Sequence, residues 1–264
     1  MPQTVLAVAA HPDDIELMMA GTMAMLGRAG YELHCLVVAN GSCGTAELER
    51  EAIIAVRAEE SRQAAAVLGA ALHGPLVDDA QIYYTPALVA RVAAVVRQVR
   101  PEILLAPSPH DYMEDHTNTS RLAVSAAFYR GMRNFVTDPP LAPVAGEVAV
   151  YHALPWGLKD PLGVAVRPHL AVDISDVLET KRQALACHRS QKDWLDASQG
   201  LGSYLRAMDE MSEAVGRLSG RFRVAEGWQR HNPLGFSGEK FRPLEAALKK
   251  GVRNLFSENE EIPL

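Results

Sequence analysis

The feature that most constrains the fold of this chain is a regular alternation of short apolar segments with longer amphipathic stretches. Four short segments are expected strands: 4–10, 32–39, 74–82 and 101–107. The first is a continuous apolar run, and the third is a weaker extended segment. Each is followed by a stretch with helical periodicity, at about 15–30, 47–68, 86–99 and 116–131. Continuous apolar runs are typical of strands buried on both faces. Four successive strand–helix units predict an α/β fold with a doubly wound, mostly parallel sheet.

The second half of the chain has a weaker pattern. Residues 147–154 and 168–175 are expected to form two more strands, and residues 176–193 a helix. No internal repeat, low-complexity tract or Ser/Pro-rich linker interrupts the sequence, so we expect one domain over 1–264. That domain divides into an α/β core and a C-terminal elaboration, at about 1–175 and 176–264.

The charge balance excludes two classes of partner. The chain has 26 Lys and Arg residues against 32 Asp and Glu residues, a formal net charge of -6. Nucleic acids and anionic membrane surfaces require a concentrated basic surface, so we expect neither, and a small molecule is the default substrate. No apolar run approaches the ~18 residues of a membrane span. Because no positively charged leader precedes the first strand, we expect a cytoplasmic protein. The three cysteines, Cys35, Cys43 and Cys187, indicate neither a disulfide framework nor a thiolate metal site.

The sharpest local signal is the run His11-Pro12-Asp13-Asp14, directly after the first strand. If the chain makes a tight turn there, which Pro12 favours, a His and an Asp three positions apart can face one metal ion. The alternative is that Asp13 or Asp14 only caps the following helix, where a carboxylate suits the positive end of the helix dipole. The motif alone supports the two interpretations about equally.

A second polar motif, residues 110–116, follows the fourth strand and contains two histidines and three acids. Taken alone it would be an exposed polar loop, but the carboxyl ends of parallel strands meet at one edge of a sheet. A His, an Asp and a second His form a nitrogen and oxygen site that leaves a coordination position open for water. Without thiolate ligands, zinc is the leading metal, with Mn2+ and Fe2+ left open.

Several other residues have two interpretations each. Arg57 and Glu60 lie three apart on one helix, a spacing typical of a surface pair. Asp78 and Asp79 either bind hydroxyl groups of a ligand or form a turn, and His188 faces either solvent or the site. The remaining histidines have no partner at ligand spacing and are expected to be structural or exposed: His34, His73, His152, His169 and His231. The loop 40–45 lacks the motifs of a nucleotide site.

The segments AHPDD, RAEESRQAAAVLGA and the late Asp115-His116 resemble the LmbE-like, or PIG-L, family of zinc-dependent N-deacetylases. The resemblance spans about residues 4–130 and continues more weakly through HRSQ (188–191) and RVAEGW (223–228). It implies a Rossmann-like fold, a homo-oligomer of three or six subunits, an amino-sugar substrate and a substrate-binding role for Arg57. It also implies one zinc ion per chain, held here by His11, Asp14 and His116. The general base that the resemblance implies is Asp13.

One position departs from the family. Many members have a His where this chain has Met113, and a thioether cannot transfer protons. Either another group takes that role, or Asp13 returns the proton itself, or activity is reduced; the candidate groups are His110, Asp111, Tyr112 and His188. Asp115 is the expected hydrogen-bond partner of the ligand His116.

The predicted activity is removal of the N-acetyl group from an N-acetylglucosamine-type conjugate. Two alternatives stay open: an amidase for a thiol conjugate or another amide, and a metal- and sugar-binding relative without catalysis.

Overall fold

A single mixed sheet organises the part of the chain that the structure, a computed structural model, describes: residues 2–191 and 204–255. Its strand order is β3-β2-β1-β4-β5-β7-β6-β8. The strands are β1 (Thr4–Ala9), β2 (Glu32–Val37), β3 (Ala70–His73), β4 (Ile103–Ala106), β5 (Ala149–Ala153), β6 (Leu170–Asp173), β7 (Ala225–Arg230) and β8 (Val252–Asn254). Strands β1 to β5 pair in parallel, and β7, β6 and β8 extend the sheet in antiparallel fashion. The predicted α/β class and mostly parallel core are confirmed.

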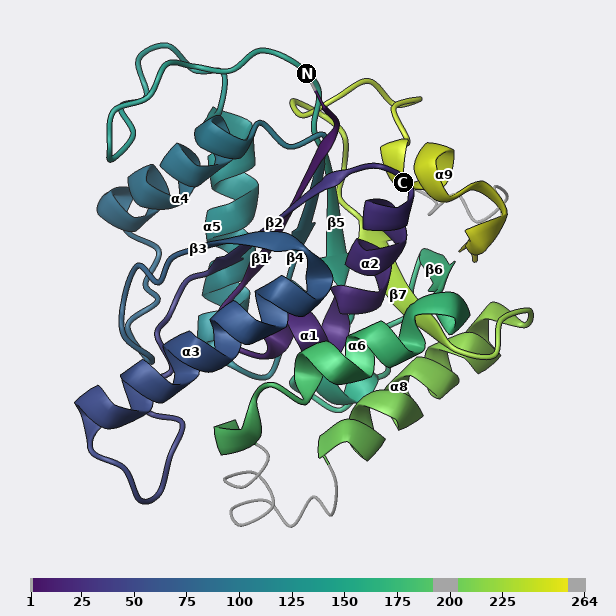
Figure 1. Cartoon of the computed structure of the whole chain (residues 1–264). Coiled ribbons are helices and arrows are strands. Elements are labelled where there is room, and N and C mark those ends of the chain that lie inside the picture. The colour runs from purple at the N-terminus through teal and green to yellow at the C-terminus, as the bar shows by residue number, and fades with distance from the viewer. Residues whose placement is uncertain (1, 192–203, 256–264) are drawn as a thin grey trace.

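Helices cover both faces of the sheet (Figure 1). Their bounds are α1 (Asp14–Met18), α2 (Ala20–Arg28), α3 (Arg50–Leu68), α4 (Pro86–Val99), α5 (Glu114–Tyr129), α6 (Leu178–Leu185), α8 (Tyr204–Ser219) and α9 (Pro243–Leu248). Helices α4 and α5 pack against each other on one face, and α2, α6 and α8 lie on the opposite face (Figure 1). The chain runs from β1 outward to β2 and β3, and then returns to β4 on the other side of β1. The strand order therefore reverses between β1 and β4, which is where ligands bind in sheets of this kind.

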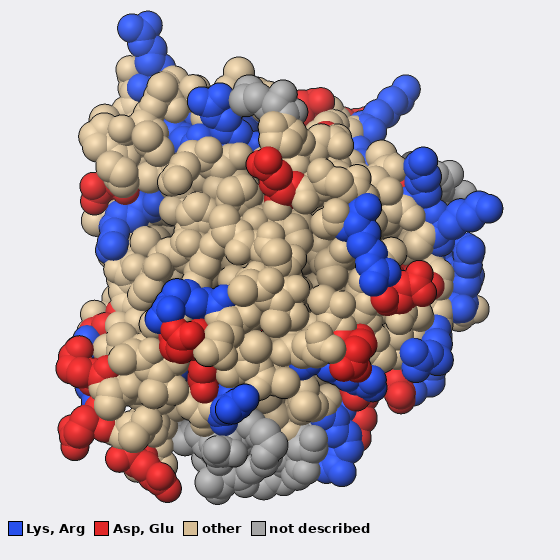
Figure 2. All heavy atoms as spheres, viewed as in Figure 1, with Lys and Arg blue, Asp and Glu red and all other residues tan. Residues whose placement is uncertain are grey.

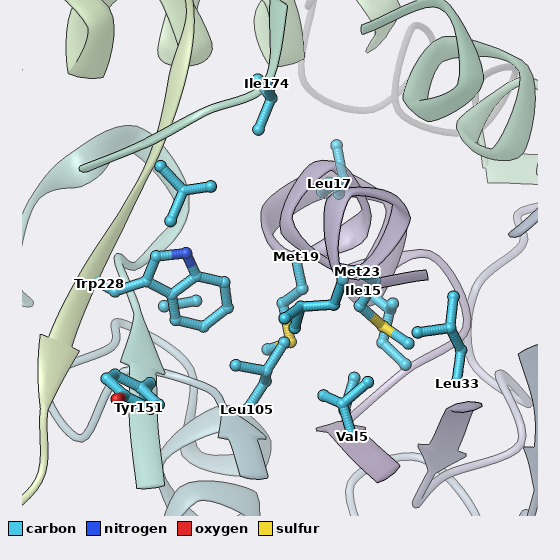
Figure 3. Close-up of a cluster of buried hydrophobic side chains, with 14 of the residues drawn as sticks. Val5, Ile15, Leu17, Met19, Met23, Leu33, Leu105, Tyr151, Ile174 and Trp228 are labelled. Atoms are coloured by element: carbon cyan, nitrogen blue, oxygen red, sulfur yellow. The ribbon is translucent and has the colours of Figure 1, made fainter. Parts of the chain in front are cut away.

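Two hydrophobic cores explain why the first strand is a continuous apolar run. Val5 and Ala7 of β1 belong to the core on the α2 face, and Leu6 and Val8 belong to the core on the α4 and α5 face. A strand buried on both sides has no position for a polar side chain. Figure 3 shows the α2-side core, where Trp228 of β7 lies among apolar side chains from the sheet and the first helices.

Two elements of the N-terminal half differ from the sequence-based prediction. The helix expected at 15–30 is divided at Met19 into α1 and α2. The division is stabilised by the buried carboxylate of Glu226, which accepts hydrogen bonds from the N–H groups of Gly21 (2.8 Å) and Thr22 (2.7 Å) at the start of α2. The strand expected at 74–82 lies earlier, because β3 begins directly after Gly69, which ends α3 with φ of 69°.

The C-terminal half also departs from expectation. The helix expected at 176–193 is preceded by a 3-10 turn and is represented by the shorter α6, and the end of the expected helix lies outside the described residues. Strand β7 was not expected, because its sequence AEGWQR has neither an apolar run nor a clean alternation. Its Trp228 is fully buried and donates a hydrogen bond to Thr22 Oγ1 at 2.9 Å.

Within residues 2–191 and 204–255, no helix has the length and apolar character needed to cross a membrane. Figure 2 shows both signs of charge around the margin of the face in view, with a largely uncharged centre.

Candidate metal centre

The loops that follow β1 and β4 meet at the point where the strand order reverses. A cavity of about 600 Å³ lies there, and both sequence motifs line it together with residues from α3, the segment 79–83 and α8. Helix α1 begins at Asp14 and helix α5 at Glu114, so each motif is held between the end of a buried strand and the first turn of a helix. The fold thus brings together two motifs that lie about a hundred residues apart.

Three side chains from these loops form a possible metal-binding triad: His11, Asp14 and His116, whose ligand atoms all lie within 4.8 Å of one another. Asp14 Oδ2 is 3.6 Å from His11 Nδ1 and 3.4 Å from His116 Nε2. The same Oδ2 accepts a 2.8 Å hydrogen bond from the His11 backbone N–H, which fixes the carboxylate. Two imidazoles and one carboxylate suit zinc and leave room for further ligands, so the donor set fits the metal that the sequence predicts.

The outer nitrogen of each imidazole is already bound to a carboxylate. His11 Nε2 lies 3.0 Å from Asp115 Oδ2, and His116 Nδ1 lies 2.9 Å from Asp111 Oδ1. The pairing corrects the sequence-based expectation: Asp115 orients His11, and Asp111 is the partner of His116. Asp115 lies in the first turn of α5 and reaches His11 in the loop after β1, whereas Asp111 lies in the loop that precedes α5. Both rings therefore present their inner nitrogen to Asp14.

The carboxylates around the two imidazoles of the triad favour positive charge on the rings. Burial lowers the pKa of His11, but the hydrogen bonds to Asp115 and Asp14 outweigh it and raise that pKa to about 10. The pKa of His116 is also raised: burial opposes the shift, and the charges of Asp14 and Asp111 prevail. The pKa of Asp14 is lowered despite its burial, because His116 and His11 favour the carboxylate. The pocket is built for positive charge between these three residues.

Asp13 is held in an unusual backbone conformation beside the triad. Its φ is 101°, in a region that side-chain-bearing residues rarely adopt, and its side chain makes no capping hydrogen bond to α1. Tyr204 Oη donates to Asp13 Oδ2 at 2.5 Å, and Arg57 Nη2 lies 3.4 Å from Asp13 Oδ1. Burial raises the pKa of Asp13, and the nearby charge of Arg57 opposes the rise. The helix-cap interpretation of the Asp13 side chain is wrong, and backbone strain of this kind clusters at functional sites.

Arg57 and Glu60 do not form the surface pair that their spacing allowed. Both side chains are buried, and Arg57 Nη2 also donates to the Pro12 carbonyl. Glu60 accepts hydrogen bonds from the backbone N–H and the hydroxyl of Ser190, at 2.9 and 2.7 Å. Arg57 therefore supports the His-Pro-Asp-Asp loop, and Glu60 fastens the HRSQ segment to α3.

Asp79 and Asp78 hold the loop after β2. Asp79 accepts hydrogen bonds from the Gly41 and Cys43 N–H groups at 2.7 and 2.9 Å, and it also lines the cavity. Asp78 binds the side chains of Asn40 and Arg50. The geometry matches the turn interpretation of these two acids.

Four residues are candidates to replace the proton-transferring histidine for which this chain has Met113, and they lie in different places. Tyr112 lines the cavity, with its ring centroid 5.9 Å from that of His116, and Asp111 is bound to His116. His188 is 1% exposed and lies 3.4 Å from Glu16, so it faces neither solvent nor the cavity. His110 is exposed and lines a different cavity.

Tyr204 is the residue that sequence reasoning missed. It lies 191 positions from its partner Asp13, in a helix without a recognisable motif, so no local signal identifies it. Gln191 also lines the cavity and donates to the Gly44 carbonyl at 2.8 Å; the HRSQ resemblance was the available signal for it.

Fold and site together define a class of protein: a doubly wound α/β protein with a possible nitrogen and oxygen metal triad, and a buried carboxylate beside it, at the switch point of the sheet. Comparison with known proteins narrows the class. The family model described as PIG-L: GlcNAc-PI de-N-acetylase matches residues 6–127. The diacetylchitobiose deacetylase of Thermococcus kodakarensis is 30% identical over 236 residues, covering 84% of this chain and 81% of that protein. This chain belongs to the PIG-L family.

Two solved structures agree with that assignment. The N,N'-diacetylchitobiose deacetylase of Pyrococcus horikoshii has a TM-score of 0.73 at 24% identity, covering 92% of this chain and 89% of that chain, which supports the fold. The 4-carboxy-2-hydroxymuconate hydratase of Pseudomonas putida has a TM-score of 0.72 at 26% identity, covering 88% and 97%. The predicted PIG-L membership and α/β fold are confirmed, and the expected deacetylase class agrees with the diacetylchitobiose deacetylases among the relatives.

Proposed function

We propose that this protein is a zinc-dependent hydrolase that removes the N-acetyl group from an N-acetylglucosamine-type amino sugar. One observation supports the proposal: Asp13, a buried carboxylate, adjoins His11, Asp14 and His116, whose possible ligand atoms all lie within 4.8 Å of one another. The similarity to the diacetylchitobiose deacetylase supports the choice of substrate class.

His11, Asp14 and His116 would hold the metal, and Asp115 and Asp111 would keep the two imidazoles oriented toward it. A bound zinc ion lowers the pKa of a water ligand toward ~7 and polarises an amide carbonyl. The residues around the triad exclude bulk water, since Asp13, Asp111, Asp115 and His116 are all less than 10% exposed. Charge interactions are strengthened in such an environment.

Asp13 accepts the proton of the attacking water and is held for that purpose by Tyr204 and Arg57. Collapse of the tetrahedral adduct breaks the C–N bond and releases acetate and a primary amine, which takes up a proton. Two groups in the cavity can supply that proton, because Asp111 is committed to His116 and His188 and His110 lie outside the cavity. They are Asp13, returning the proton it took, and Tyr112, whose burial raises its pKa to about 12 and keeps its hydroxyl protonated.

Released acetate is the direct test. N,N'-Diacetylchitobiose and N-acetylglucosamine are incubated with zinc-loaded protein, and acetate and new primary amine are measured. We expect Asp13→Asn to keep its metal and to lose at least about a hundredfold in turnover, the typical contribution of a general base. His11→Ala should lose the metal itself, as seen by elemental analysis. Asp176→Asn, which changes an exposed carboxylate outside the cavity, is the matched control. Full turnover by Asp13→Asn would exclude Asp13 as the base.

A second candidate activity is hydration of a carbon–carbon double bond in an unsaturated polycarboxylate. It is favoured by the similarity to the Pseudomonas putida hydratase and by Met113, which removes a proton-transfer group of many deacetylases. A panel of N-acetyl sugars, thiol-conjugate amides and unsaturated polycarboxylates separates these reactions, because hydration changes the ultraviolet absorbance and releases no amine.

By the same family resemblance we propose a homo-oligomer of three or six subunits. Light scattering after size-exclusion chromatography gives the mass directly, and a mass of one chain at all protein concentrations would contradict the proposal.

A further inference from the structure

A second cavity, of about 620 Å³, lies alongside α5 and is separated from the candidate metal centre by the loop 107–111. Pro107 and Ser108 line the metal-centre cavity, and the next two residues, Pro109 and His110, line the second one. The neighbouring ends of β5 and β7 and the C-terminal part of α5 complete it. The second cavity is therefore distinct from the metal-centre cavity, although the loop 107–111 borders both.

The lining of this second cavity is strongly biased in charge. It contains two guanidinium groups and four imidazoles and no carboxylate, in a chain with a formal net charge of -6. The charged and titratable residues are Arg121, Arg230, His110, His152, His169, His231 and Tyr84. A surface hollow with basic groups and no acids favours anions over cations and neutral sugars.

The hydrogen bonds of His152 fix the protons on two of these imidazoles. His152 Nδ1 lies 2.9 Å from the Pro107 carbonyl, which only accepts, so Nδ1 carries a hydrogen. In neutral His152 the Nε2 atom is then an acceptor, and the His231 Nδ1 atom 3.0 Å away must donate to it. Neutral His231 consequently has a bare Nε2. Among the described residues, a proton added at that atom breaks no hydrogen bond, and it creates a cationic donor.

Arg121 is held in place without a carboxylate partner among the contacts of the described residues. Its Cζ atom lies 4.7 Å from the centroid of the Tyr84 ring, and Tyr84 Oη is 2.9 Å from Ser125 Oγ on the same helix. Stacking uses the face of the guanidinium and leaves its N–H edge for a ligand. By contrast, the Arg230 guanidinium donates to the carbonyls of Glu239 and Phe241. Its contribution to the cavity is therefore mainly its positive charge.

We propose that this cavity is an anion-binding site that takes a small oxyanion, a sulfate, phosphate or carboxylate group, between Arg121 and His231. Binding is coupled to uptake of one proton by His231. Burial lowers the pKa values of His231 and His169 and lowers that of His152 to about 4, so burial disfavours the charged form of these three imidazoles. An anion favours the charged form of His231 and is therefore bound more tightly at lower pH.

Calorimetric titration of the full-length, metal-loaded protein with sulfate tests the site, because sulfate keeps its charge between pH 6 and pH 8. We expect saturable binding that weakens as the pH rises. Arg121→Gln should weaken binding about tenfold, the usual effect of losing one charge-assisted hydrogen bond. His231→Gln should retain part of the affinity and lose its pH dependence. Arg217→Gln, an exposed arginine on α8, is the matched control and should bind like the unaltered protein.

Sulfate held by the metal is distinguished with His116→Ala, which should bind sulfate in the second cavity as before. Absence of saturable binding, or binding that both Arg121→Gln and His231→Gln leave unchanged, would overturn the proposal. A free anion and an acidic substituent of a substrate share this chemistry. Competition kinetics with sulfate separate the two. If the cavity receives an acidic substituent of the substrate, sulfate raises the KM of an acidic N-acetyl substrate and leaves that of N,N'-diacetylchitobiose unchanged. If the ligand is a free anion, sulfate raises neither KM.

Discussion

At the scale of single residues, the candidate site depends on which carboxylate contacts which imidazole. Asp111 accepts from His116 Nδ1 at 2.9 Å and also from the Met113 backbone N–H at 3.1 Å, so it fixes both the ring and the loop before α5. Carboxylates that bind the outer nitrogen of a ligating histidine set its tautomer and raise its basicity. Asp111 therefore acts on the metal through His116.

Asp111→Asn should lower metal affinity by about 10- to 100-fold, the usual effect of losing such a partner. Competition with a chromogenic zinc chelator measures this loss directly. Asp115→Asn should have an effect of similar size through His11, whereas Asp176→Asn should have none. If Asp111→Asn bound zinc as tightly as the unaltered protein, the ring of His116 would not depend on Asp111.

The residues of the two motifs could be predicted because a local pattern was enough. A buried strand followed by His11-Pro12-Asp13-Asp14, and a second strand followed by residues 110–116, have to meet at one edge of a parallel sheet. The pairing of Asp111 with His116, in place of Asp115, could not be predicted, since it depends on the path of a loop. Tyr204 could not be predicted either, because tertiary packing alone brings it to Asp13.

At the scale of elements, α8 connects the C-terminal half of the chain to the His-Pro-Asp-Asp loop. Its first residue, Tyr204, is 2% exposed and donates to Asp13, while Met208 one turn later packs into the α2-side core. The helix is thus anchored by apolar burial and positions one hydroxyl.

Tyr204→Phe should reduce turnover about tenfold with little change in KM or bound metal, because a buried carboxylate loses one hydrogen bond and the packing is preserved. Steady-state kinetics and elemental analysis measure these quantities together. The matched control is Tyr151→Phe, which removes a hydrogen bond from another buried tyrosine to Glu245, outside the cavity. Equal losses of turnover in the two variants would indicate a general effect on stability.

A buried ion pair joins three further elements. Lys181 Nζ on α6 donates to Glu226 Oε1 on β7 at 2.6 Å, and the same carboxylate caps α2 through Gly21 and Thr22. Both side chains are at most 3% exposed. The Glu226 carboxylate thus connects the unexpected strand β7 to the start of α2, and no periodicity of the sequence reveals this contact, because Glu226 is 205 residues from Gly21.

Lys181→Met should lower the free energy of unfolding by about 3–5 kcal/mol, because it leaves the Glu226 charge buried and unpaired. Urea denaturation measures the loss, and Lys240→Met, at an exposed lysine, is the control. Adding Glu226→Gln to Lys181→Met removes the unpaired charge, so the double variant should unfold at a higher urea concentration than Lys181→Met alone. If it unfolded at a lower concentration, the carboxylate would stabilise α2 without its lysine.

At the scale of the whole molecule, the excess of six acids over bases comes partly from acids that are concentrated at one site. Five of the acids line the metal-centre cavity at the carboxyl ends of β1 and β4: Asp13, Asp14, Asp111, Glu114 and Asp115. Despite burial, the surrounding carboxylates raise the pKa of His11 to about 10 and also raise that of His116, so both imidazoles favour the charged form. A metal ion bound to these residues would compete with the protons, which would link metal affinity to pH.

The stabilisation by metal should therefore increase with pH. The pKa of His11 in the folded, metal-free protein is about 10, above its ordinary value of 6.5. The bound proton stabilises the metal-free fold fully below about pH 6.5, and this contribution is lost as the pH rises toward 10. Over the same interval the competing proton leaves and metal affinity rises, so the difference in Tm between metal-loaded and metal-free protein should widen from pH 6 to pH 9.

Thermal unfolding with and without saturating zinc across this range measures the difference, and calorimetry in two buffers of unequal ionisation enthalpy counts the released protons. Neutral histidines bind metal without releasing a proton, so a constant Tm difference and zero proton release would show that Asp14 and Asp115 do not hold His11 in its charged form. His116→Ala is the control: it removes a ligand, keeps the Asp115 contact to His11, and should lose the zinc-dependent shift in Tm at every pH. The pH dependence of metal stabilisation thus reports on the same carboxylate contacts that orient the two imidazoles.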